Sequence, residues 1–152
     1  AHSFSLPSDV DYIIGHNIDY DWNVIGRPNI RRICTLALAR KTWQKIDAYS
    51  QSALLYYLDR GNARKILKNA HSAETDVKIC GVILEKLCAE LKVSSFESLW
   101  HLSEDARMPT VMPFGKYKGT LISEVPIDYK KWLLNQDNID PYLKDAFLNA
   151  ER

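Results

Sequence analysis

The sequence has no long apolar segment, few cysteines and almost no net charge. No apolar run approaches the roughly 20 residues that a membrane-spanning helix needs, so we expect no membrane partner. Because the formal net charge is only +1, a polyanion would have to be held by local patches of charge. The three cysteines, Cys34, Cys80 and Cys88, form neither a CxxC pair nor a zinc-finger spacing. We therefore predict reduced thiols and a cytoplasmic protein.

What the sequence does contain is the composition of an ordinary globular protein. Of its 152 residues, 46% are hydrophobic and 26% are charged, as is typical of a chain that buries a core. This length suits one domain, or one domain with a small addition. Internal repeats and low-complexity tracts are not evident. Function must therefore be inferred from local motifs.

The pattern of apolar residues predicts a helix-rich α/β fold. Short strands are expected at residues 12–15 and 30–33, and helices at 50–58, 72–92, 127–134 and 141–150. A further short helix is expected from Trp22, and Gly61 is expected to end the helix that begins at residue 50. The regular apolar pattern is interrupted between residues 107 and 113, where two prolines occur. We therefore predict one domain at residues 1–106 and a small appended domain at residues 107–152.

Two clusters combine a histidine with an aspartate. His16 and Asp21 follow the first predicted strand, at the strand end where open α/β sheets place their ligand sites. His71 and Asp76 lie where the long helix begins, and the helical period puts Asp76 on the buried face with Cys80. Carboxylates on separate elements that converge with a histidine suit metal-assisted phosphodiester hydrolysis. The alternative for Asp76 is that it caps the helix N-terminus.

The order of residues in these clusters resembles that of a known enzyme family. Residues 15–21, Gly-His-Asn-x-x-x-Asp, resemble the second motif of the DEDDh 3′–5′ exonucleases, the ribonuclease-H-like family of the polymerase III proofreading subunit. Residues 71–76, His-x-Ala-x-x-Asp, resemble the third motif, and residues 34–40 resemble the helix that lies between the two motifs. The resemblance runs from about residue 12 to the end of the chain.

The resemblance implies a fold, a cofactor and roles for individual residues. The fold would be an incomplete ribonuclease-H-like exonuclease fold with a small C-terminal appended domain. Asp21 and Asp76 would hold Mg²⁺ or Mn²⁺, with two ions in the intact family site. His71 would be the general base that deprotonates the attacking water. His16 and Asn17 would support the site or contact the terminal nucleotide. Asp19 is a rival for the role of Asp21, although the motif spacing favours Asp21.

The implied activity is metal-dependent hydrolysis of DNA from single strands or 3′ ends by the two-metal route. The family's first motif, Asp-x-Glu, is not found, and the acidic pair at residues 9–11 is not accepted as its substitute. We therefore expect the C-terminal part of such an enzyme, inactive or weak, and either self-associated or completed by a missing N-terminal segment. Two alternatives stay open: a nucleic-acid-binding or scaffold module without catalysis, and an RNA-directed exonuclease.

The appended domain carries a turn at residues 114–119, Phe-Gly-Lys-Tyr-Lys-Gly, which resembles a turn in one member of the same family. Lys116 and Lys118 flank Tyr117, so the lysines would contact a nucleic-acid backbone while the tyrosine stacks on a base. The alternative is a solvated turn without a ligand. The four tryptophans are predicted to be core residues: Trp22, Trp43, Trp100 and Trp132.

Overall fold

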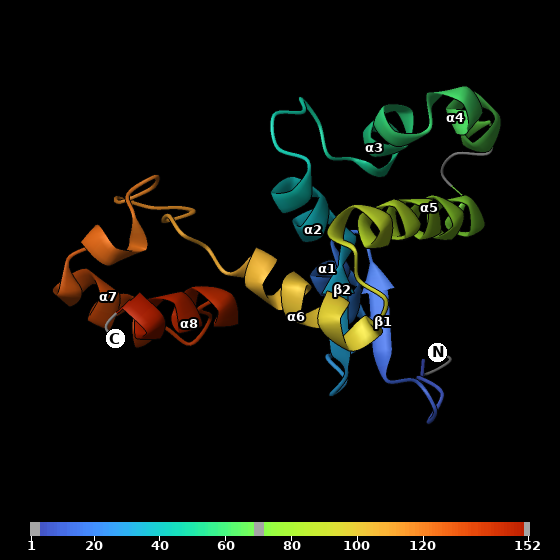
Figure 1. Cartoon of the computed structure of the whole chain (residues 1–152). Helices are drawn as coiled ribbons and strands as arrows, with labels where there is room; N and C mark the ends of the chain where they lie inside the picture. The colour runs from blue at the N-terminus through green and yellow to red at the C-terminus, as the bar shows by residue number, and fades with distance from the viewer. Residues whose placement is uncertain (1–3, 69–71, 151–152) are drawn as a thin grey trace. The chain divides into compact units, whose positions relative to one another are not determined.

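The computed structural model describes residues 4–68 and 72–150, which form a helix-rich α/β fold (Figure 1). The chain divides into two compact units, Ala1–Glu104 and Asp105–Arg152, and each is described by itself below. The predicted division into part of an exonuclease domain and an appended domain stays a prediction. None of the described helices is both long enough and apolar enough to cross a membrane.

The first unit is built on a parallel pair of short strands. These are β1 (Tyr12–Gly15) and β2 (Arg31–Cys34), and α1 (Ile18–Val24) lies between them in sequence. Among the described residues, the sheet consists of these two strands. Both strand predictions are confirmed to within a residue. The expectation that an uncovered sheet edge leads to self-association stays a prediction.

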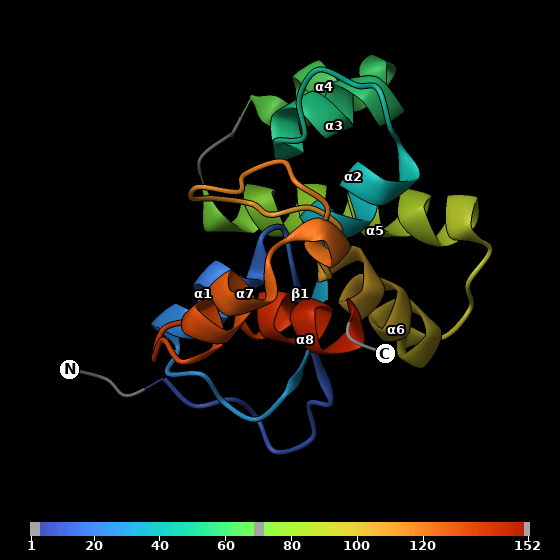
Figure 2. The same ribbon diagram turned by 90° about the vertical axis from the view of Figure 1, so that its left-hand side faces the viewer.

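Helices make up most of the rest of the first unit. They are α2 (Thr35–Thr42), α3 (Gln51–Leu58), α4 (Arg60–Leu67), α5 (Ala73–Leu91) and α6 (Phe96–Arg107). Helix α5 packs against α2, α3 and α4, and both views place it between the strands and the α3–α4 pair (Figures 1 and 2). Fully buried apolar side chains of β2 and the helices form the core: Ile33, Leu38, Leu54, Leu55, Ile79, Ile83, Leu87 and Leu99.

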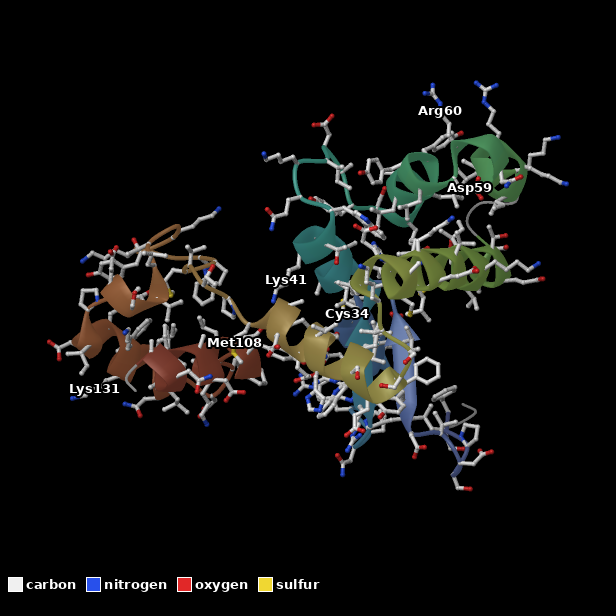
Figure 3. The ribbon with its side chains drawn as sticks, viewed as in Figure 1. Cys34, Lys41, Asp59, Arg60, Met108 and Lys131 are labelled. Carbon is white, nitrogen blue, oxygen red and sulfur yellow. The ribbon has the colours of Figure 1, made fainter. Side chains whose placement is uncertain are left out.

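Strand β2 passes into α2 without an intervening residue. Cys34 is the last residue of the strand and Thr35 the first residue of the helix. The backbone N–H of Cys34 donates a hydrogen bond to the Oγ of Ser103 in α6 at 2.8 Å. Figure 3 labels Cys34 at this junction. The side chains of Cys34, Thr35 and Ser103 are all buried, so the junction is fixed from inside the unit.

Two helix boundaries differ from the predictions. Helix α1 begins at Ile18 rather than at Trp22, because Asn17 adopts a left-handed conformation (φ 66°) that turns the chain directly after β1. Gly61 does not end α3 but lies inside α4. The break comes at Asp59, whose φ of −146° and ψ of 63° separate the two helices (Figure 3).

The second unit has a small core of its own. Its elements are a short 3₁₀ helix η1 (Ile122–Glu124), α7 (Ile127–Leu134) and α8 (Pro141–Ala150). The two predicted helices are confirmed with the expected bounds. An isolated antiparallel bridge between Val111 and Leu121 closes the turn at residues 114–119. The core consists of Met112, Ile122, Val125, Leu133, Leu143, Ala146 and Phe147.

The tryptophan prediction is wrong for Trp132. Trp22, Trp43 and Trp100 are half-buried, whereas the side chain of Trp132 is 55% exposed. The reason is the orientation of α7, which turns Leu133 toward the core of the second unit and leaves Trp132 on its surface.

Candidate active site

An open cleft in the first unit joins residues from both predicted clusters. Its volume is about 850 Å³, and its walls come from the end of β1, the first turn of α1, the start of α3 and the first half of α5. His16, Asn17, Asp21 and Asp76 all line it. The structure therefore brings the described members of the two clusters to one place, although α1 and α5 are far apart in sequence.

The two carboxylates of the cleft are both available. Asp21 and Asp76 are exposed, and among the described residues neither side chain has a hydrogen-bond or ion-pair partner. Burial raises the pKa of the nearby Cys80 thiol, and the charge of Asp21 contributes to that rise. Cys80 lies one helical turn after Asp76 and lines the same cleft as the two carboxylates.

The prediction that Asp76 lies on the buried face of its helix is wrong. Helix α5 buries a ladder at four-residue spacing: Thr75, Ile79, Ile83 and Leu87. Asp76 follows Thr75 and is therefore rotated by about 100° from that ladder, into the cleft. Nor is Asp76 the cap of the helix, because the Oγ of Ser72 accepts the hydrogen bond from the backbone N–H of Thr75.

The rival aspartate is occupied elsewhere. Asp19 forms an ion pair of 2.5 Å with Arg32, and the guanidinium of Arg32 stacks over the ring of Trp22 at 3.8 Å. Asp19 does not appear among the lining residues of the cleft. This arrangement favours Asp21 over Asp19 as the carboxylate that faces a ligand.

The Gly-His-Asn sequence has a local structural explanation. A Cβ on Gly15 would come within 2.8 Å of the Cδ1 atom of Ile18, so glycine lets the buried Ile18 pack under the turn. Asn17 is one of the residue types that tolerate the left-handed conformation found there. These two residues turn the chain sharply from β1 into α1, and the turn places Asp21 at the cleft.

His16 holds this turn in place through both of its ring nitrogens. Its Nε2 atom lies 2.6 Å from the carbonyl oxygen of Tyr49, so Nε2–H is the donor. The Nδ1 atom must then accept from the hydroxyl of Thr35, at 2.9 Å. Burial lowers the pKa of His16 from 6.5, and the positive charge of Arg40 acts in the same direction. Both ring nitrogens of His16 are therefore occupied, and neither is free for the predicted contact with nucleic acid.

The remaining predicted groups are less well defined. His71, the expected general base, lies outside the described residues. Among the described residues, no group of three or more His, Cys, Asp and Glu side chains is arranged to hold a metal ion. Asp21 and Asp76 nevertheless suit Mg²⁺, which is commonly held by one or two carboxylates together with water and substrate phosphates.

Three polar lining residues, Tyr20, Ser50 and Gln51, were not foreseen. Tyr20 is 68% exposed and lies in the cleft next to Asp21, and its place three residues after Asn17 could have indicated it. Gln51 also lines the cleft, and its Nε2 donates to the backbone oxygen of Asp76 at 3.3 Å. Nothing in the sequence near Gln51 indicates that contact, which joins residues 25 positions apart.

Comparison with known proteins gives a distant enzyme relative. Two curated proteins named Exodeoxyribonuclease 10, from Escherichia coli K12 and Escherichia coli O6:H1, are each 27% identical to the chain over 140 residues. The match covers 88% of this chain and 62% of each relative, so the chain spans less than two thirds of their length. The motifs resemble those of exodeoxyribonuclease X, a DEDDh enzyme; that type and that member stay predictions.

The C-terminal part of the chain has a second resemblance. A family model described as "Putative quorum-sensing-regulated virulence factor" matches residues 101–140. This segment contains the turn at residues 114–119 and α7. No solved structure matches the chain.

Proposed function

We propose that the cleft is a metal-dependent 3′–5′ exonuclease site that acts on DNA. The observation that supports this proposal is the convergence of Asp21 and Asp76 on one cleft from two separate helices. Their oxygens are the ligands that Mg²⁺ and Mn²⁺ accept. The distant similarity to an exodeoxyribonuclease supports DNA as the substrate.

The residues of the cleft, and His71, would have separate tasks. Asp21 and Asp76 would hold the metal, which would supply Lewis-acid activation of the phosphodiester and its attacking water. His71 would take the proton from that water. Asn17 and Tyr20, which also line the cleft, would contact the terminal nucleotide.

Turnover should be slow. Two-metal hydrolysis requires both the attacking and the leaving oxygen to be clamped, and the described residues offer two carboxylates in the cleft rather than a larger cluster. The Asp-x-Glu motif that would supply further ligands is not found in the sequence. We therefore expect metal binding to be easier to detect than hydrolysis.

The test measures metal binding and hydrolysis together. Mn²⁺ binding would be followed by electron paramagnetic resonance, and hydrolysis by release of label from 3′-labelled single-stranded DNA. Asp21→Asn and Asp76→Asn should each weaken Mn²⁺ binding and remove any hydrolysis. Glu85→Gln, an exposed carboxylate on the same helix as Asp76, is the matched control and should change neither. If Asp76→Asn binds Mn²⁺ as well as Glu85→Gln does, the proposal fails.

A second candidate is a nucleic-acid-binding module without catalysis. The exposed lysines of the turn at residues 114–119 favour it. Two results together would favour this candidate. The chain would bind DNA in the presence of EDTA, and without EDTA it would bind no Mn²⁺ at Asp21 and Asp76. The same assay with a 3′-labelled RNA would separate DNA from RNA preference.

A cytoplasmic location is proposed as well, because all three cysteines are free.

A further inference from the structure

A row of aromatic rings lies on the surface of the second unit. The rings of Tyr117 and Tyr129 meet edge to face with their centroids 4.8 Å apart. The ring of Trp132 continues the row, with its centroid 5.5 Å from that of Tyr129. We call these three residues the aromatic ladder. Tyr117 and Tyr129 are half-buried against the core of the unit, whereas Trp132 is 55% exposed. The aromatic ladder therefore runs from the core of the unit to the exposed ring of Trp132.

The turn that carries Tyr117 is held against α7. Gly115 has φ +76°, and a Cβ there would come within 2.9 Å of the hydroxyl oxygen of Tyr129, so the backbone of the turn passes directly beside that ring. The backbone N–H of Thr120 donates to the carbonyl of Tyr117 at 3.0 Å, and that of Gly119 donates to Met112 at 2.9 Å. The turn and the helix thus form one preorganised surface.

Positive charge lies at the Tyr117 end of the ladder. Residues 111–135 contain four lysines, of which Lys130 is buried, and two exposed acidic residues. The Nζ atom of Lys116 lies 5.4 Å from the centroid of the Tyr117 ring, while Lys118 and Lys131 are exposed. Figure 3 shows Lys131 extending outward from α7. A ligand that covers the ladder would therefore meet an ammonium group at the Tyr117 end, which favours a negatively charged ligand.

We propose that the aromatic ladder binds single-stranded nucleic acid, with a base stacked on Trp132 and phosphates paired with Lys116 and Lys118. Unpaired bases present the flat faces that stack on aromatic side chains, and lysines beside the rings track the backbone. A duplex hides those faces. An apolar protein surface would leave the lysines beside Tyr117 without partners, whereas phosphates pair with them. This binding does not depend on the proposed hydrolysis at the cleft.

The first test measures the affinity of the full chain for a fluorescein-labelled oligo(dT) by anisotropy, in EDTA to prevent hydrolysis. Trp132→Ala should weaken binding by roughly 5- to 150-fold, which corresponds to the loss of one stacked base. Ile127→Ala is the matched control, because Ile127 lies on the same helix and is also 55% exposed. Trp132→Phe retains a ring and should keep most of the affinity.

The second test measures the salt dependence of the same binding. Each lysine that contacts a phosphate of a single strand adds about 0.7 to the slope of log affinity against log salt. Lys116→Gln and Lys118→Gln should each lower the slope by about that amount, and Lys144→Gln, an exposed lysine of α8, should leave it unchanged.

Several outcomes would overturn the proposal: no binding of the oligonucleotide, equal losses in Trp132→Ala and Ile127→Ala, or equal affinity for a duplex of the same length. A small phosphodiester, thymidine 5′-(p-nitrophenyl phosphate), separates this proposal from the proposed function, because its hydrolysis requires the cleft alone. If Asp76→Asn does not affect its hydrolysis while Trp132→Ala weakens oligonucleotide binding, then only the exonuclease proposal fails.

Discussion

The Nδ1 atom of His16 lies 2.9 Å from the Oγ1 atom of Thr35, and this hydrogen bond ties the end of β1 to the start of α2. The same hydroxyl lies 3.8 Å from the sulfur of Cys80 in α5. The bond therefore connects three elements beside the cleft. Because Thr35 is fully buried, water cannot replace its hydroxyl without a change in packing.

Thr35→Val should destabilise the protein by about 1–3 kcal/mol. The substitution keeps the shape of the side chain but leaves the partly buried Nδ1 of His16 without its donor. Urea unfolding, followed by circular dichroism, measures the change. Thr42→Val at the end of the same helix is the control. Equal losses in the two variants would contradict the assignment of a special role to the Thr35 hydroxyl.

The pH dependence of stability should contain a contribution from His16. Burial, with help from the charge of Arg40, lowers the pKa of His16 from 6.5 in the folded protein. As the pH falls through 6.5, the unfolded chain takes up this proton before the folded protein does. The free energy of unfolding should therefore decrease as the pH falls from 6.5 to the lowered pKa of His16. Above pH 6.5 this histidine should make no contribution to the pH dependence.

The measurement compares urea unfolding at about pH 5.5 and about pH 7.5. The loss of stability at the lower pH should be smaller in His16→Gln than in the unmodified protein. His101→Gln, which changes an exposed histidine, should retain the full loss. A loss of the same size in His16→Gln would show that this histidine does not contribute.

Two glycine substitutions should change stability in opposite directions. Gly15→Ala should cost about 1 kcal/mol, because the new Cβ would lie 2.8 Å from the Cδ1 of the buried Ile18. Gly81→Ala should stabilise the protein by about 0.5–1 kcal/mol. The residue lies inside α5, and a Cβ added there would meet no atom within 4 Å outside the neighbouring helix backbone. Thermal unfolding measures both, and a stabilising Gly15→Ala would contradict the close approach of Ile18.

Ser72→Ala should remove the cap of α5. The Oγ of Ser72 accepts from the backbone N–H of Thr75 at 3.2 Å, and losing such a cap costs about 1 kcal/mol. Ser72→Asp should keep most of the stability, because aspartate caps about as well as serine. If Ser72→Asp is as unstable as Ser72→Ala in urea unfolding, the hydroxyl of Ser72 has a role other than capping.

The sequence predicts best what depends on neighbouring residues. The bounds of α7 and α8 are confirmed, and those of α5 to within a residue at each end, because apolar periodicity and capping residues act within a few positions. The loopless passage into α2 is also consistent with the expected helix at residues 34–40. These features need no knowledge of the rest of the chain.

What could not be predicted depends on distant contacts. Helix α5 has apolar residues on more than one side, so its period could not show that Ile79 and Ile83 face the core while Val77 is 71% exposed. The error over Asp76 follows from this ambiguity. The contact of His16 with Tyr49 uses a backbone carbonyl, which every residue has, so no residue type could have indicated it.

The direct passage of β2 into α2 also fixes the length of the chain at that point. One residue inserted between Cys34 and Thr35 would rotate α2 by about 100° and carry the buried Leu38 and Ala39 out of the core. An extra residue within residues 44–48, which form neither helix nor strand, would leave both neighbouring helices in place. Length variants of this protein that still fold should therefore differ in the second segment and not at the first junction.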